Sequence, residues 1–220
     1  MMNLQKTAGI AALCEALIYI TTFALYGTVL AMPGGLDAAQ KLEFLAEKQS
    51  LLFFSNLLGY VIFGILLAVL VLALHERLKN AAATLTQLAS IFGVVCVGLV
   101  IASGMLANIG LNAVLKLSII EPEQTRALWL SVTTITEALG GGNEIVGGFW
   151  VLLISCAGLK ATVLPKTLHY LGIAVGAAGI ATCYPADGLT EIFGISQIIW
   201  FGYLGIAMLR QRQDYSFKQV

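Results

Sequence analysis

Two glutamates inside apolar stretches, Glu15 and Glu144, are the residues whose type and position best suit chemistry. An ionisable side chain within a membrane is costly, so each is a candidate for function. Glu15, Tyr19, Thr22 and Tyr26 recur at helical spacing and form one polar stripe. We expect this stripe to face the interior of a bundle or a cavity. Two interpretations of Glu15 stay open: a protonated side chain hydrogen-bonded to a neighbouring helix, or a proton or cation site.

Glu144 lies beside the glycine triplet Gly140–Gly142, well before the next basic residue, Lys160. Three glycines weaken a helix, and a break there frees backbone groups that can line a site. Glu137 shares a helical face with Glu144, and Asn143 is adjacent to it. Glu144 is therefore either a ligand-binding carboxylate or a structural one. Glu144 and its neighbours, together with polar residues of other apolar stretches, suggest a polar pocket that opens outward. The candidate ligand-binding residues are Glu15, Tyr19, Asn56, Tyr60, Asn108, Glu137, Asn143 and Glu144.

No sequence motif indicates catalysis, a metal or a cofactor. A zinc hydrolase needs three or more nitrogen, oxygen or sulfur ligands in one place, and the histidines, His75 and His169, do not cluster with others. The common hydrolase, metalloprotease and phosphate-loop motifs do not occur. We predict no catalytic residue, no metal site and no cofactor. The formal net charge of zero gives no electrostatic footprint for nucleic acid.

The composition indicates a lipid bilayer as the surroundings of most of the chain. It is 59% hydrophobic and 11% charged, with a mean hydropathy of +0.90, whereas soluble domains carry about 25% charged residues. The sequence predicts an all-α, polytopic bundle, in which residues 1–220 form one transmembrane domain. The six predicted spans are Thr7–Ala31, Ser50–Leu74, Thr84–Ser118, Pro122–Leu159, Pro165–Tyr184 and Leu189–Leu209.

The third and fourth predicted spans are longer than a bilayer needs. Thr84–Ser118 would be about 52 Å long as a helix, against a hydrocarbon core about 30 Å thick. Pro122 is well placed at the start of the next helix. We therefore expect the third and fourth spans to protrude together as a helical hairpin. Before the second span, Asp37 is predicted to cap a short amphipathic helix over Ala38–Gln49, which could lie on the membrane surface.

The basic residues of the loops fix an orientation. Cytoplasmic loops carry an excess of lysine and arginine. The N-terminus, the loops after the second and fourth spans, and the C-terminal tail carry this excess, so both termini are predicted to be cytoplasmic. The basic residues that support this are Lys6, Arg77, Lys79, Lys160, Lys166, Arg210, Arg212 and Lys218.

Small residues recur at spacings that allow helices to approach closely. Gly172 and Gly176 are four residues apart, and Gly202 and Gly205 are three apart. In lipid such faces pack helices together. Two interpretations stay open: packing within one bundle, or the face of a homo-oligomer.

Several short segments resemble a bacterial family of six-span membrane proteins. They are Gly148–Leu153, Gly158–Lys160, Val163–Lys166, Leu171–Gly172 and, at the end of the second span, Leu74–Leu78. On these segments the chain resembles the domain of unknown function 4386. The resemblance implies a bacterial cytoplasmic-membrane protein without an established activity, and it carries over no catalytic residue.

Three functions are compatible with these patterns. The first is a membrane protein that binds, or moves, a small molecule, ion or lipid in an outward-opening polar pocket. The second is a structural or accessory membrane protein that acts through partner contacts, and the third is an intramembrane enzyme. A polar cavity would favour the first, and a filled bundle with small residues on its outer face would favour the second.

Overall fold

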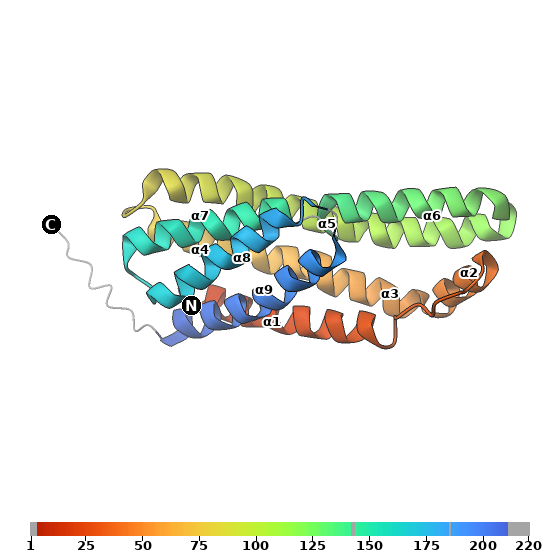
Figure 1. The fold of residues 1–220 in the computed structure, drawn as a ribbon, viewed down its shortest axis with the longest axis horizontal. Helices are drawn as coiled ribbons and strands as arrows, with labels where there is room; N and C mark the ends of the chain where they lie inside the picture. The colour runs from red at the N-terminus through yellow and green to blue at the C-terminus, as the bar shows by residue number, and fades with distance from the viewer. Residues whose placement is uncertain (1–3, 142–143, 185, 211–220) are drawn as a thin grey trace.

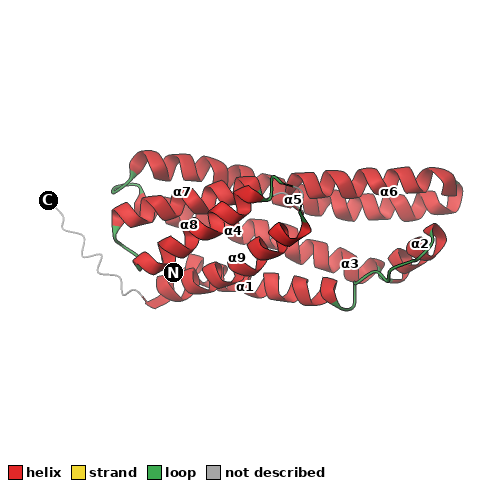
Figure 2. Cartoon of the chain, in the orientation of Figure 1, coloured by secondary structure: helices red, strands yellow, loops and turns green. Residues whose placement is uncertain are grey.

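The computed structural model describes residues 4–141, 144–184 and 186–210. Every element in this part of the chain is a helix, and short turns connect them (Figure 2). The predicted helix bundle is therefore confirmed. In chain order the elements are α1 (Leu4–Gly27), α2 (Ala38–Glu47), α3 (Gln49–Asn56), the π-helical turn η1 (Leu57–Ile62), α4 (Phe63–Leu78), α5 (Ala83–Ile120), α6 (Pro122–Thr136), the π-helical turn η2 (Glu137–Gly141), α7 (Ile145–Ala161), α8 (Lys166–Ala181) and α9 (Asp187–Arg210).

The long helices lie along one axis in an elongated bundle (Figure 1). The start of α1 and the end of α9 lie at the same end, where the two helices pack closely. A Cβ atom on Gly205 would lie only 2.8 Å from the carbonyl oxygen of Gly9. The core of the bundle contains Trp150, Trp200 and Leu74, each 2% exposed or less.

Five helical segments in the described residues are long and apolar enough to cross a membrane: Leu4–Gly27, Gln49–Leu78, Ala83–Ile120, Gln124–Ala161 and Gly188–Arg210. The predicted fifth span corresponds to α8, which has 16 residues. A helix of this length is about 24 Å long, a little short of the hydrocarbon core. The chain is thus a multi-pass membrane protein, and the count of six spans stays a prediction.

The predicted helical hairpin is present. α5 runs for 38 residues, and α6 packs antiparallel against its second half (Figure 1). Pro122 occupies the first turn of α6, as expected. The hairpin extends past the other long helices and has only the short helices α2 and α3 near it (Figure 1).

The predicted N-terminal cap of the short helix is also confirmed. The backbone N–H of Gln40 donates to Asp37 Oδ1 at 2.9 Å, and the backbone N–H of Asp37 donates to Gln40 Oε1 at 3.0 Å. This reciprocal pair satisfies two amides at a helix start. The helix ends at Glu47, two residues earlier than predicted, because α3 begins at Gln49. Leu45 is its one buried residue.

The glycines of α8 are used inside the bundle. A Cβ atom on Gly176 would lie 2.7 Å from the carbonyl oxygen of Gly148, so the backbones of α7 and α8 touch. Gly172 likewise faces Trp200, because a Cβ atom on Gly172 would lie 2.7 Å from Trp200 Nε1. By contrast, Gly202 has no neighbour within 4 Å of such an atom. Packing within one bundle thus accounts for the α8 pair, and a homo-oligomer stays a prediction.

Candidate functional site

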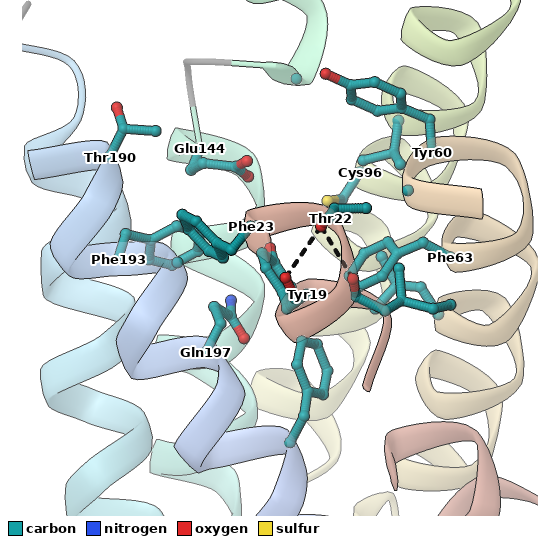
Figure 3. Close-up of a pocket in the computed structure, with 18 of the residues that line it drawn as sticks. Tyr19, Thr22, Phe23, Tyr60, Phe63, Cys96, Glu144, Thr190, Phe193 and Gln197 are labelled. Atoms are coloured by element: carbon teal, nitrogen blue, oxygen red, sulfur yellow. Dashed lines mark hydrogen bonds between the residues drawn. The ribbon is translucent and has the colours of Figure 1, made fainter. Parts of the chain in front are cut away.

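A cavity of about 240 Å³ lies in the middle of the bundle (Figure 3). Its lining residues come from α1, α3, η1, α4, α5, η2, α7 and α9, together with Glu144, which precedes α7. Its lining from α1 runs from Ile18 to Tyr26, and its lining from α9 runs from Thr190 to Phe201. These are the halves of α1 and α9 that lie away from the end they share.

Both π-helical turns border this cavity. Gly59 and Tyr60 of η1 contribute to its wall, as does Gly140 of η2. A π-helical turn is rare and occurs often at functional sites, because it shifts side chains from the regular helical register. The break in the fourth span coincides with the glycine triplet, as predicted, although Gly142 lies outside the described residues.

The backbone of Glu144 is fixed by α8. Its N–H donates to Thr182 Oγ1 at 2.9 Å, and that hydroxyl donates to the carbonyl oxygen of Gly179 at 2.7 Å. Glu144 is the residue that precedes α7, and its carbonyl oxygen accepts from the N–H of Gly148 at 2.7 Å. The main chain is therefore held firmly while the side chain remains available to the cavity.

The Glu144 carboxylate points into the cavity toward Cys96 and Thr22 (Figure 3). A Cβ atom on Gly147 would lie 3.6 Å from Glu144 Oε2 and 3.5 Å from Cys96 Sγ, so both groups border the same space. Among the residues that the structure describes, none forms a hydrogen bond or an ion pair with this carboxylate, and no lysine, arginine or histidine lines the cavity. Within the described part of the chain, the site therefore carries an acidic group without an ionic or hydrogen-bonding partner.

Aromatic rings form much of the wall around this carboxylate. The Tyr19 and Phe63 rings meet edge to face with centroids 5.3 Å apart, and the Phe63 and Phe201 rings do so at 5.9 Å. Phe193 and Tyr60 also line the cavity (Figure 3). Such rings present negative faces that attract a cation.

Three buried polar atoms of lining residues have no hydrogen-bond partner in the described part of the chain. They are Ser55 Oγ, Trp150 Nε1 and Gln197 Oε1. Buried polar groups usually find a partner in the protein or in water. Because these buried atoms border the cavity and lack a partner in the described residues, they are candidates to contact a ligand.

A chain of hydrogen bonds holds Tyr26, a lining residue, to the neighbouring helices. The Tyr26 hydroxyl donates to Asn56 Oδ1 at 2.9 Å, and Asn56 Nδ2 donates to Asn108 Oδ1 at 3.0 Å. Asn108 Nδ2 then donates to the carbonyl oxygen of Phe53 at 3.3 Å. Neither asparagine is among the residues that line the cavity, so both position Tyr26 instead.

Glu15 faces the bundle interior, as its stripe predicted, and is 0% exposed. It lies one turn before Tyr19 and is not among the lining residues. Neither carboxylate oxygen has a hydrogen-bond partner among the described residues. The interpretation of a hydrogen bond to a neighbouring helix is therefore not supported.

The structure brings three of the eight candidate residues into the cavity: Tyr19, Tyr60 and Glu144. Glu137 is exposed and outside the lining, and Asn143 lies outside the described residues. Sequence reasoning missed Cys96, Ser55 and Gln197. Of these, Gln197 had a readable signal, because it is a lone amide within an apolar stretch.

The comparisons with known proteins identify a family. The family model described as Domain of unknown function (DUF4386) matches residues 7–209. No curated protein and no solved structure matches the chain.

Proposed function

The chain belongs to the DUF4386 family, and we propose that it is a membrane protein that binds a small organic cation in the central cavity. The observation that carries this proposal is the Glu144 carboxylate, which faces an aromatic-lined cavity with no ionic partner among the described residues. Glu144 is the anionic group that pairs with the ligand.

Charge selects the ligand class. An unpaired carboxylate in apolar surroundings is unfavourable, and a bound cation removes that cost. The side chains of Tyr19, Phe63 and Tyr60 line the same cavity, and each ring whose face meets the ammonium group adds cation–π attraction of about 0.5–2 kcal/mol. An anion would meet no basic side chain among the described lining residues. The cavity is thus suited to an ammonium group.

Size narrows the class further. The cavity measures about 240 Å³. Cavities for drug-sized ligands measure about 300–1,000 Å³. These volumes favour a small amine or quaternary ammonium ion over a lipid.

The position of the cavity supports access from outside the cell. The lining comes from the halves of α1 and α9 that lie away from the end these helices share. If that end is cytoplasmic, as the basic residues predict, the cavity lies in the outer half of a bacterial cytoplasmic membrane. The proposal is therefore a receptor or carrier site that loads from the outside.

A ligand-stability experiment tests the proposal. Purified protein is heated with tetramethylammonium, with a primary amine such as benzylamine, or with acetate as an anion control. We expect the cations alone to raise the midpoint of unfolding, since a ligand that binds only the folded state stabilises it. Glu144→Gln should lower the cation affinity at least tenfold, because the ionic contact is lost while the shape is kept.

Glu137→Gln is the matched control, since it removes an exposed carboxylate that lies seven residues earlier and outside the cavity lining, and it should leave the affinity unchanged. The proposal fails if neither cation stabilises the protein, or if Glu144→Gln binds as tightly as the unaltered chain.

A further inference from the structure

Glu15 is a buried ionisable group that the proposed cation site does not use. It is 0% exposed, both of its oxygens lack a partner among the described residues, and it lies one turn from Tyr19, which lines the cavity. We propose that Glu15 is a second cation site, occupied by a proton, and that binding of the organic cation beside Glu144 releases this proton. The inference rests on the proposed function and adds an exchange to it.

The surroundings of Glu15 determine which cation it holds. α1 packs mainly against α4, α9 and η1. The basic residues of α4 lie in its last turn, where Arg77 Nη1 donates to Gln5 Oε1 at 3.0 Å. Gln5 is ten residues before Glu15, or about 15 Å along the helix. The α9 residue Arg210 lies at the same end as the start of α1.

The ionisable groups near Glu15 are uncharged apart from the second glutamate. Cys14 precedes it and Tyr19 follows one turn later on α1, and the ionisable side chain of α5 that lines the neighbouring cavity is Cys96. On η1 the ionisable side chain is Tyr60. None of these supplies a positive charge. An ionised carboxylate would therefore be buried without compensation, at a cost that a bound proton removes.

Tyr19 lies between Glu15 and the cavity that holds the Glu144 carboxylate, because it follows Glu15 by one turn of α1 and lines that cavity. Glu15 is therefore one helical turn beyond the cavity wall into which Glu144 points. A cation bound at Glu144 favours the ionised form of Glu15, and a proton on Glu15 weakens cation binding. For unit charges about 10 Å apart and an effective dielectric constant of about 20, the coupling is about tenfold.

The proton balance of the exchange is simple. The ligand enters with one positive charge, the Glu15 carboxyl loses H⁺ to become a carboxylate, and the proton goes to solvent. No bond of the ligand forms or breaks. Net charge within the bundle is thus the same before and after binding, which avoids the cost of adding charge to a low-dielectric interior.

The affinity of tetramethylammonium, measured across pH, tests the coupling. This probe cannot titrate, so any pH dependence belongs to the protein. Because Glu15→Gln is permanently neutral, it should match the unaltered chain at low pH, where Glu15 carries its proton. At high pH the unaltered chain should bind about tenfold more tightly than Glu15→Gln. The comparison at high pH is made where Glu144 is ionised in both proteins, because the same coupling also shifts the titration of Glu144 in the unaltered chain.

Calorimetry in buffers of different ionisation enthalpy measures directly how many protons are released for each cation bound. The unaltered chain should release more protons per bound cation than Glu15→Gln. If Glu15→Gln fails to fold, Glu15→Asp should keep the release, and infrared difference spectra of the unaltered protein should lose the band of a protonated carboxyl on binding.

The inference is overturned if the ratio of the two affinities, unaltered chain to Glu15→Gln, does not change with pH. It is also overturned if the protonated-carboxyl band does not change on binding. Cation binding by the unaltered chain would then still support the proposed function. If tetramethylammonium does not bind the unaltered chain at any pH, the proposed function itself fails.

Discussion

Replacing Gly148 by alanine tests whether the contact between α7 and α8 holds the helix that follows Glu144. A Cβ atom on Gly148 would lie 2.7 Å from the backbone nitrogen of Ile180 and 2.8 Å from the carbonyl oxygen of Gly176. Both are main-chain atoms of α8, so no side chain can rotate away. The two helices must separate, and overpacking of this kind costs about 1–3 kcal/mol.

Gly98→Ala is the matched control. Gly98 lies within α5, and a Cβ atom there would have no neighbour within 4 Å. Alanine should therefore give only the helix-propensity gain, about 1 kcal/mol relative to glycine. Both variants share this gain, so the difference between their free energies of unfolding equals the cost of overpacking, about 1–3 kcal/mol. For a chain of this length that is about 2–12 °C in the unfolding midpoint.

A thiol-reactive fluorophore provides the assay in a chain in which the partly or fully exposed Cys14, Cys156 and Cys183 are replaced by alanine, since the remaining Cys96 is buried in the folded protein and becomes reactive on unfolding. The Gly148→Ala protein should react at a lower temperature than the Gly98→Ala protein. It should also bind tetramethylammonium more weakly, because the separation displaces the start of α7 beside Glu144. Equal midpoints for the two variants would show that α7 and α8 can move apart freely, and the packing argument would be refuted.

Three further outcomes are expected. Cysteines introduced at Gln40 and Ser216, in an otherwise cysteine-free chain, should react with an impermeant thiol reagent from opposite sides of the membrane; labelling from the same side would contradict the predicted orientation. Asn56→Ala should destabilise the protein by about 1–3 kcal/mol, because it breaks the bonded chain between α1 and α5, whereas the exposed Asn112→Ala should stay within about 0.5 kcal/mol; thermal unfolding of both variants checks this, and equal losses would contradict it. Asp37→Ala removes the cap of α2, worth about 1 kcal/mol, so hydrogen exchange should quicken in that helix and not in α5.

The sequence predicted local features well where one residue type has one structural use. Asp37 was predicted to start a helix because its side chain can bond a free amide, and it does so. Pro122 was placed at a helix start, which its missing N–H allows, and it lies there. The glycine triplet was predicted to interrupt the fourth span, and the helix does change at Gly140.

The lining of the cavity could not be predicted in the same way, because it depends on how each helix is rotated against its neighbours. Leu17 and Ile18 are adjacent and equally apolar, yet Leu17 is 62% exposed and Ile18 is 7% exposed. In a soluble helix polar residues would mark the outer face. In a membrane the outer face is apolar too, so Cys96 and Phe201 carried no sign that they face the cavity.

The placement of the two irregular turns links the fold to the proposed site. Irregular backbone at membrane depth is tolerated only where protein covers it or where it lines a cavity. η1 and η2 lie on different spans, both pack against α5, and both contribute residues to the same cavity. A filled bundle would give no reason for two interruptions to face one space. The backbone therefore points to the same region as the unpaired carboxylate of Glu144, on evidence that does not depend on any charged side chain.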